Sequence, residues 1–548
     1  MSPLAPPRGT GSPAAATTAA LALLLALAWY AYAQLDLRGR PEEDAAMLLR
    51  YSGHLAQGYG IVWNVGERPV DGATDFLFML VVAALHRAGL SLETAARGLG
   101  LAAHAATVLI LFLGARRLYG APAHWAAVPA AFYAIGPGLR HLAACYGTPL
   151  FALAVAVSWS YASVLADATE GKERRAALGF ALAALAMGLA RPEGVFLGGF
   201  MLLAVLLVRR GSSARLIVGR YLLVFLTLGL AYFLWRFWYF GWPLPNPFYK
   251  KGAFLLHWHS LRMAWRDLWR LGLPFLLLPL LGLLVRGARR ASLFVLTPVA
   301  LFVALWVLIS DETNYLMRFR QPVVPVLLLG SVPVAQALGR RLRGAWPSPR
   351  LPAAAGWVAA LAVASALGWS EHRAYRYIAP ERMGLYDAAR VLHDYAPRGF
   401  ALATTESGLL PLYSEWRALD AWGLNDAWVA HHGGIDEAYL DRYRPEVMMV
   451  HAYFSPGVAK NGPRVENRAL GPAWYRMVTT MIGYAERHDY RLAACFGRDA
   501  WDTHYYYVRR GFPKSDEIAA RLRSLDYDWD GEPTTDFAAE AGEPKAAR

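Results

Sequence analysis

Long apolar blocks recur along the chain and stop at about residue 370. Examples are Leu21–Trp29, Val108–Leu113, Leu202–Val208, Phe275–Val285 and Val323–Leu329. Overall, 56% of the residues are hydrophobic and 18% are charged, whereas a soluble globular protein is about half apolar and a quarter charged. We therefore predict a polytopic α-helical membrane protein with a water-facing C-terminal domain. A single soluble domain, a disordered chain and a disulfide scaffold are excluded.

The formal net charge of +14 lies mostly in short loops between the apolar blocks. Loops of this kind orient membrane proteins, and no basic-aromatic motif for nucleic acid is present, so no nucleic-acid partner is predicted. The sequence has no CxxC, HExxH or Walker-type loop, which excludes cysteine-ligated metal and P-loop chemistry. No certain cofactor is predicted, and a divalent metal stays open. Cys145 and Cys495 are expected to be two lone thiols rather than one disulfide.

The apolar blocks predict about eleven transmembrane helices, since a hydrocarbon core about 30 Å thick needs roughly 20 apolar residues per helix. The basic loops all reach the cytoplasm if 74–90 is a half-embedded segment that does not cross. The spans are then 16–34, 97–114, 123–137, 149–167, 176–190, 195–208, 221–239, 271–285, 292–309, 321–338 and 352–369. This topology predicts a bacterial inner membrane protein whose N-terminus lies inside and whose C-terminal domain is extracytoplasmic.

Three regions follow from this topology: a transmembrane domain, 1–369, a C-terminal α/β domain, 370–530, and a disordered tail, 531–548. The α/β assignment rests on expected strands at 400–404, 447–453 and 504–508 and helices at 385–395 and 474–484. The outer-face segments of the membrane domain are 35–73, 138–148, a bend at 191–194, 240–258 and 310–320. They hold nearly all of its ionisable groups apart from the cytoplasmic loops. We therefore expect the chemistry there.

The first outer loop, 35–73, carries two acids, Glu43 and Asp44, at the start of an amphipathic helix that ends before Gly58. Acids in a first helical turn often only stabilise the helix. The same position also keeps a carboxylate ionised, which a general base for an acceptor hydroxyl requires.

Several motifs in this loop resemble the GT-C glycosyltransferases, most closely the mycobacterial terminal arabinofuranosyltransferase family. They are E-D-A-x-x-x-x-R-Y from residue 43, G-x-G-x-V-x-N-x-G-E-R from residue 58 and D-G-x-T-D-F-L from residue 71. Further matches follow in the family's order: L-A-R-P-E-G from residue 189, P-N-P-F-Y-K from residue 245, R-F-R-Q-P from residue 318, G-L-L-P-L-Y-S from residue 408 and D-A-W-G-L-N-D from residue 420. The resemblance covers most of residues 40–430.

The resemblance implies transfer of a sugar, with arabinofuranose as one candidate, from a polyprenyl-phosphate donor in the lipid bilayer to a hydroxyl of a glycan, lipid or protein acceptor on the outer face. Such a reaction needs a carboxylate, here Asp44 aided by Glu43, and cations at the donor phosphate. The phosphate-binding candidates are Arg318, Arg320, Arg191, Arg236 and Lys250. The substrate-binding candidates are Asn64, Glu67, Asp71, Glu193, Asn246, Tyr249, Asp420, Asn425 and Asp426.

Two departures and several alternatives stand beside this interpretation. The family's first acidic pair is usually two aspartates, and its S-G-x-E-T-P-L-F segment reads A-C-Y-G-T-P-L-F here, with Gly147 in place of the glutamate. Arg191 could merely pair with Glu193, and Lys250 could snorkel at the interface. The alternative functions are transfer of another sugar to protein or lipid A, and a non-enzymatic transporter or flippase with a periplasmic cap.

Overall fold

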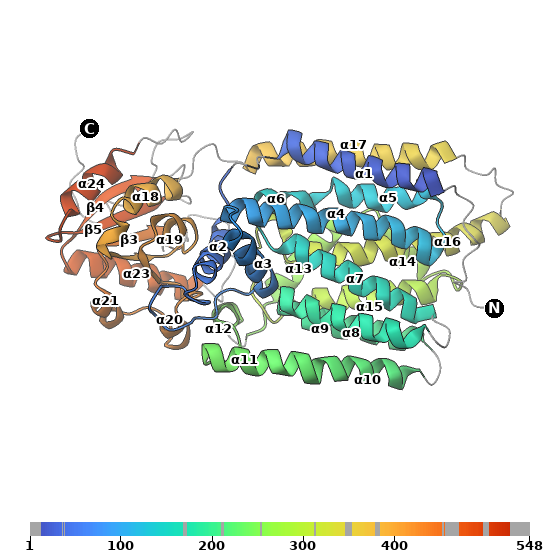
Figure 1. Cartoon of the computed structure of the whole chain (residues 1–548), viewed down its shortest axis with the longest axis horizontal. Coiled ribbons are helices and arrows are strands. Elements are labelled where there is room, and N and C mark those ends of the chain that lie inside the picture. Colours follow the sequence, from blue (N-terminus) through green and yellow to red (C-terminus); the bar gives the residue numbers. More distant parts are fainter. Residues whose placement is uncertain are drawn as a thin grey trace.

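The computed structural model describes residues 13–35, 37, 39–167, 172–209, 213–252, 255–311, 314–345, 353–378, 384–451, 454, 471–496 and 503–525. The predicted disordered tail, 531–548, lies outside these residues. Most helices up to Ile378 run side by side in a bundle, and the later elements form an α/β unit at one end of it (Figure 1). Among the described residues, the β-sheet lies in this unit, at one end of the bundle.

The bundle helices coincide with the apolar blocks of the sequence. They are α1 (Pro13–Gln34), α4 (Leu92–Tyr119), α5 (Ala123–Ala134), α7 (Thr148–Asp167), α8 (Glu173–Ala190), α9 (Glu193–Val208), α10 (Ala214–Val224), α11 (Leu230–Phe240), α14 (Leu277–Gly282), α15 (Arg289–Leu305), α16 (Val324–Ala345) and α17 (Ala353–Ile378). The short α14 covers only part of the expected span at 271–285, and α17 continues past the expected boundary at 369.

Within the described part of the chain, four helices are long and apolar enough to cross a membrane: Leu92–Tyr119, Thr148–Asp167, Ala214–Phe240 and Tyr315–Arg341. Shorter apolar helices are Thr17–Ala33, Phe76–Arg87, Glu193–Val208 and Val358–Ser370. The protein is therefore membrane-bound. The number of crossings, about eleven, stays a prediction because helix length and composition alone do not fix which helices cross a bilayer.

Local sequence signals explain where the helices begin and end. The Ser91 hydroxyl accepts a hydrogen bond of 3.2 Å from the Thr94 amide and caps the start of α4. Helix α4 ends at Gly120 and α11 ends at Gly241, with φ of 64° and 81°, a left-handed conformation that glycine adopts without strain. A π-helical turn, Phe225–Gly229, joins α10 to α11 in one largely exposed apolar rod. Such a surface suits contact with lipid.

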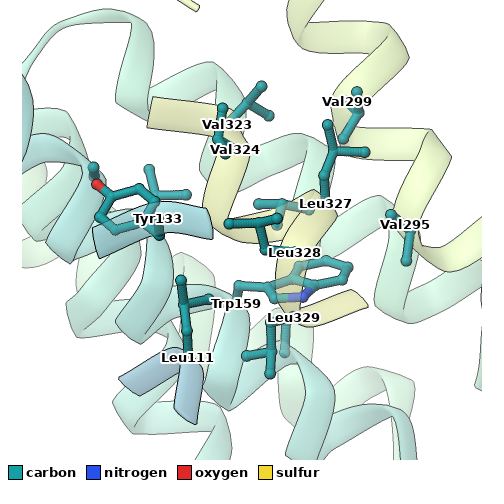
Figure 2. Packing of buried hydrophobic residues seen from close by; sticks show 14 of the residues in the cluster. Leu111, Tyr133, Trp159, Val295, Val299, Val323, Val324, Leu327, Leu328 and Leu329 are labelled. Atoms are coloured by element: carbon teal, nitrogen blue, oxygen red, sulfur yellow. The ribbon is translucent and has the colours of Figure 1, made fainter. Parts of the chain in front are cut away.

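The core of the bundle is packed around Trp159 of α7. Figure 2 shows this indole near Leu111 of α4, Val295 of α15 and Leu329 of α16, and all of these side chains are buried. The Trp159 ring stacks on Phe294 at 4.4 Å between ring centres. These apolar contacts hold together helices that are far apart in the sequence and so fix the bundle end that carries the site.

Five shorter helices connect the bundle helices at or near the end that carries the α/β unit. They are α2 (Glu43–Ala56), α3 (Phe76–Arg87), α6 (Arg140–Ala143), α12 (Asn246–Lys251) and α13 (Trp258–Gly272). In Figure 1, α2, α3 and α12 lie between the bundle and the α/β unit. Helix α3 is the segment that the sequence predicts to be half-embedded, and its 12 residues are too few for a full crossing.

The α/β unit is built on a five-stranded sheet with the order β2-β1-β3-β5-β4. The strands are β1 (Ala401–Thr404), β2 (Arg417–Asp420), β3 (Val447–His451), β4 (Tyr490–Phe496) and β5 (His504–Arg509). Strand β1 pairs in parallel with β2 and β3, and β5 pairs antiparallel with β3 and β4. The three strands expected from the sequence are β1, β3 and β5, whereas the sequence analysis did not identify β2 and β4.

Helices cover both faces of the sheet. They are α18 (Gly384–His393), α19 (Leu409–Ser414), α20 (Ala427–His431), α21 (Glu437–Tyr443), α23 (Gly471–Arg487) and α24 (Ser515–Arg523). Leu402 and Met449 pack in one cluster with α18 and α24, while Ala403 and Met448 pack in another with α21 and α23. Successive strand residues thus face opposite sides. The loops after β1 and β2 meet α2, so the carboxyl ends of these parallel strands face the first outer loop.

Candidate active site

An ion pair joins Asp44, in the first turn of α2, to Arg318, which precedes α16. The two residues are 274 positions apart in the sequence, and their side chains are only 13% and 7% exposed. The Arg318 guanidinium carbon lies 4.4 Å from the centre of the Tyr146 ring. Among the described residues its Nε atom has no hydrogen-bond partner. The predicted carboxylate and one predicted phosphate-binding cation are therefore in direct contact.

A second ionic group lies beside this pair. Arg191 contacts the Asp75 carboxylate at 2.8 Å and the Glu193 carboxylate at 2.6 Å. Its guanidinium carbon lies 5.3 Å from the centre of the Phe319 ring, and that of Arg318 lies 5.0 Å from the same centre. The pairing of Arg191 with Glu193 is the structural alternative that the sequence left open. The shared aromatic ring brings both arginines to one place.

Asp75 is a site residue that the sequence analysis did not single out. It is buried at the start of α3 and forms no side-chain hydrogen bond that caps this helix. A Cβ atom on Gly147 would lie 2.5 Å from the Asp75 Oδ2 atom. The missing side chain at residue 147 therefore makes room for the Asp75 carboxylate. An acid directly before an apolar helix was the available signal, since such an acid is costly near a membrane unless it is paired.

Arg320 contacts a different pair of acids, Asp311 and Asp267. Its side chain is fully buried, forms an ion pair with Asp311 and lies 4.0 Å from the Asp267 carboxylate. Its guanidinium carbon stands 4.4 Å from the centre of the Trp306 ring. Burial raises the pKa of Asp311 to about 6, although the charge of Arg320 opposes that rise. These contacts fix the loop that carries Arg318 against α13.

A separate polar cluster contains the other two predicted cations. Arg236 contacts the Asp71 carboxylate at 2.5 Å, and the Asn246 amide donates to the Asp71 carbonyl oxygen at 3.0 Å. The Lys250 Nζ atom lies 4.2 Å from the centre of the Trp422 ring. Burial lowers the pKa of Lys250 to about 8, with the nearby Asp420 carboxylate opposing the shift. Arg236 and Lys250 therefore contact an acid and an aromatic ring of this cluster, Asp71 and Trp422.

The remaining candidates after β2 organise their own loop. The Asp420 carboxylate accepts hydrogen bonds from the Trp422, Gly423 and Asn425 amides at 2.8–3.0 Å. The Asp426 carboxylate caps α20 by accepting from the Val429 amide at 3.0 Å. Burial raises the pKa of Asp426 to about 6. This loop reaches the first outer loop where the Asn425 side-chain amide meets the Met47 sulfur at 3.0 Å.

Tyr249 belongs to an aromatic group at the edge of the same region. Its ring centre lies 4.5 Å from that of His431, and the His431 ring stacks on Trp242 at 3.5 Å. His431 therefore packs between two aromatic rings. In the described part of the chain, no group of three His, Cys, Asp or Glu side chains is arranged to hold a metal ion.

Glu43 faces the α/β unit, while its neighbour Asp44 faces Arg318. The Glu43 carboxylate accepts hydrogen bonds from the Gly408 amide and, at 2.9 Å, from the Leu409 amide. Burial raises the pKa of Glu43 well above its usual value, and the Glu406 carboxylate raises it further. A side chain on Gly408 would overlap the Glu43 carbonyl oxygen. The two adjacent acids thus point to different parts of the molecule.

Buried contacts from the first loop extend this attachment. The Arg50 guanidinium donates to the Trp63 and Trp416 carbonyl oxygens, each at 2.9 Å. The Asn64 side chain donates to the Ala418 carbonyl at 3.0 Å and accepts from the Ala418 amide at 2.9 Å. Glu67 contacts Arg417 at 2.6 Å. These bonds hold the first outer loop, and with it α2, against the beginning of the edge strand β2.

Known proteins share parts of this fold. A family described as a domain of unknown function (DUF8728) matches residues 371–508, which include most of the sheet. No curated protein matches the sequence significantly. The crystal structure of ArnT from Cupriavidus metallidurans in the apo state is similar over 93% of this chain and 100% of that chain, with 14% identity and a TM-score of 0.53.

Two further solved structures belong in this comparison. ArnT from Cupriavidus metallidurans bound to undecaprenyl phosphate matches over 94% of this chain and 100% of that chain, with 12% identity and a TM-score of 0.53. The arabinofuranosyltransferase AftD from Mycobacteria matches over 93% of this chain but 41% of its own, with 16% identity and a TM-score of 0.48. The similarity to ArnT covers both the bundle and the α/β unit, and the chain accordingly has the GT-C fold.

Proposed function

We propose that the protein is a membrane glycosyltransferase that moves a sugar from a polyprenyl-phosphate donor to an acceptor hydroxyl. The observation that carries this proposal is the contact between Asp44 and Arg318. A sugar leaving a phosphate develops positive charge at its anomeric carbon, while negative charge grows on the phosphate. A carboxylate and a guanidinium in contact offer both forms of stabilisation within one small volume.

In the proposed reaction the bond between the anomeric carbon and the phosphate oxygen breaks as the acceptor oxygen bonds to that carbon. Asp44 takes the proton of the acceptor hydroxyl, and the polyprenyl phosphate leaves with the electron pair of the broken bond. Arg318 binds the phosphate through charge-assisted hydrogen bonds. Arg191 adds a second positive charge beside Phe319, and Asp75 and Glu193 hold it in place. Glu43 supports Asp44 indirectly, because it attaches α2 to the α/β unit.

An arabinofuranosyl donor is our first candidate because the motifs of the first outer loop resemble the arabinofuranosyltransferase family. The acceptor is then a glycan of the cell envelope. Gly147 departs from that family, and Asp75 occupies the space next to it. Transfer of another sugar to a protein or to lipid A is the second candidate. The family's glutamate at position 147 is absent and Asp75 lies there beside Arg191, and this difference affects which donor or acceptor fits.

A transporter or flippase is the rival function. Broken helices and charged residues near the middle of the membrane are typical of transporters. Here the ion pairs of Asp44, Asp71 and Asp75 gather near the end of the bundle that meets the α/β unit. This one-sided arrangement favours a reaction at the membrane surface over passage through the bundle.

The decisive experiment incubates the purified full-length protein with a panel of polyprenyl-phosphate pentoses and hexoses and follows release of the sugar. We expect one donor class to be consumed with an acceptor glycan present, and Asp44→Asn to abolish the consumption. If no donor is consumed while the protein moves labelled lipid across a vesicle bilayer, the protein is a flippase.

We also predict that the α/β unit lies outside the cytoplasm, as the distribution of basic loops indicates. A periplasm-active reporter fused after Ile378, at the end of α17, should be active. The same reporter fused after Arg343 should be inactive, because the basic cluster of Arg340, Arg341 and Arg343 is expected in the cytoplasm. The reverse pattern, active after Arg343 and inactive after Ile378, would contradict both the topology and the proposed reaction.

A further inference from the structure

Helix α13 presents an unusual exposed face that the proposed reaction does not use. Trp258 is 67% exposed and Trp265 is 46% exposed. Arg262, Arg266 and Arg270 are exposed as well. The spacing of four residues places the three arginines in one row along the helix, with the two tryptophans beside them.

The opposite face of α13 is tied to the loop that carries Arg318. The Ser260 hydroxyl accepts a hydrogen bond of 2.7 Å from the Asp311 amide, and the Asp267 carboxylate accepts one of 2.9 Å from the Asn314 side chain. Asp267 is the only acidic residue in the helix and is 1% exposed. The Arg266 guanidinium lies 3.7 Å from the Asp267 carboxylate but is 48% exposed, so the exposed charged side chains of α13 are all cationic. The helix lies at the bundle end that holds the ion pair of Asp44.

This combination of side chains selects among possible surroundings. A face turned to bulk water has no reason to expose two tryptophans. A face turned to hydrocarbon would not carry three arginines, because charge there is costly. The headgroup layer suits both, since indole rings collect at that depth and guanidinium groups bind phosphate bidentately. The layer must also supply negative charge, because the face has no acid of its own.

We propose that the exposed face of α13, formed by Trp258, Arg262, Trp265, Arg266 and Arg270, is a docking surface for anionic phospholipid headgroups. The arginine row binds lipid phosphates, and the two indoles insert beside the acyl chains. Because α13 is hydrogen-bonded to Asp311 and Asn314, which precede Arg318, bound lipid also stabilises the position of Arg318. This surface goes beyond the proposed transferase reaction and is testable without any sugar donor.

The experiment uses the full-length protein in bilayer nanodiscs and a phosphatidylglycerol with a photoactivatable headgroup. After illumination, mass spectrometry of chymotryptic peptides measures the crosslinking yield at 258–272. The peptide that contains the exposed cluster Arg286, Arg289 and Arg290 serves as an internal reference. We expect crosslinks at 258–272 from phosphatidylglycerol and several-fold fewer from the matching phosphatidylcholine probe. One millimolar inorganic phosphate should not reduce them.

The triple variant Arg262→Gln, Arg266→Gln and Arg270→Gln should lower this yield at least about tenfold, since each arginine near a charged membrane contributes a factor of about five. The reference yield should stay unchanged. The corresponding triple lysine variant should keep most of the yield, and the single variant Arg266→Gln should lose about fivefold, which guards against misfolding of the triple variant.

The matched control removes three exposed arginines from the α/β unit: Arg390→Gln, Arg442→Gln and Arg510→Gln. It should leave the yield at 258–272 unchanged. Equal yields from the two lipids, an unaffected triple glutamine variant, or an equal loss in the control would each overturn the docking surface. None of these results bears on the transferase proposal, because no reaction is measured.

Discussion

Asp44→Asn is expected to lower turnover by at least about a hundredfold while donor binding is largely kept. The substitution preserves shape but removes the base that takes the acceptor proton, and general-base catalysis contributes a factor of about a hundred to ten thousand. The ion pair with Arg318 makes the expectation more specific. Without the competing carboxylate, Arg318 is freer to bind phosphate, so donor affinity should hold or rise as kcat falls. Single-turnover kinetics with a labelled donor, at a series of enzyme concentrations in excess of the donor, measure both quantities.

Two other carboxylates separate catalysis from structure. Glu93→Gln is the control, because the Glu93 carboxylate accepts from the Tyr413 hydroxyl at 2.5 Å and lies outside the proposed site. It should keep kcat within a few-fold. Glu43→Gln should lower stability more than kcat, since its carboxylate holds two amides of the α/β unit. If Glu43→Gln loses turnover and Asp44→Asn does not, the base is Glu43; normal turnover in both removes the active-site proposal.

Arg320→Gln is expected to destabilise the protein by about 3–5 kcal/mol, the usual cost of removing one partner of a buried ion pair. It leaves the Asp311 carboxylate buried without its ion-pair partner, while Asp267 keeps Arg266 at 3.7 Å. Arg318→Gln should raise the KM for donor at least about tenfold, because it removes a charge-assisted bond to the phosphate, whereas Arg320→Gln should leave that KM within a few-fold. Thermal unfolding and donor titration distinguish the two variants.

The same pair of variants tests an assumption drawn from the sequence. Arg318 and Arg320 are two residues apart before one apolar helix, and the sequence assigns both to the donor phosphate. In the structure, one cation meets Asp44 and the other meets Asp311. Equal loss of donor affinity with unchanged stability in both variants would restore the common role.

The sequence predicts the architecture well because its signals are local and strong. The apolar blocks become bundle helices, since burial of apolar surface in lipid or in the core dominates over such lengths. The strands β3 and β5 appear where β-branched or aromatic residues gather, and β1, A-L-A-T, is a short apolar run. The sequence analysis did not identify strand β2, because this strand has only four residues, R-A-L-D, and two of them are charged.

The sequence predicts most residues of the candidate site but not which of them contact one another. Glu43 and Asp44 are neighbours with the same chemistry, and helix geometry turns adjacent side chains about 100° apart, so they meet different partners. One binds the amides after β1 and the other binds Arg318. The sequence analysis did not single out Asp75, because the space for its carboxylate is provided by Gly147. The two residues are 72 positions apart in the sequence and are neighbours only in the folded protein.

By itself the sequence determined the apolar bundle helices, the α/β unit and the set of charged residues in the loops between the apolar blocks, because hydrophobic periodicity and charge placement act over neighbouring residues. Only the tertiary structure decided which acid pairs with which cation. That choice depends on the packing of α2, α13 and the loop before α16. Contacts between residues hundreds of positions apart leave no local pattern, and the strong distance dependence of electrostatic interactions then assigns their roles.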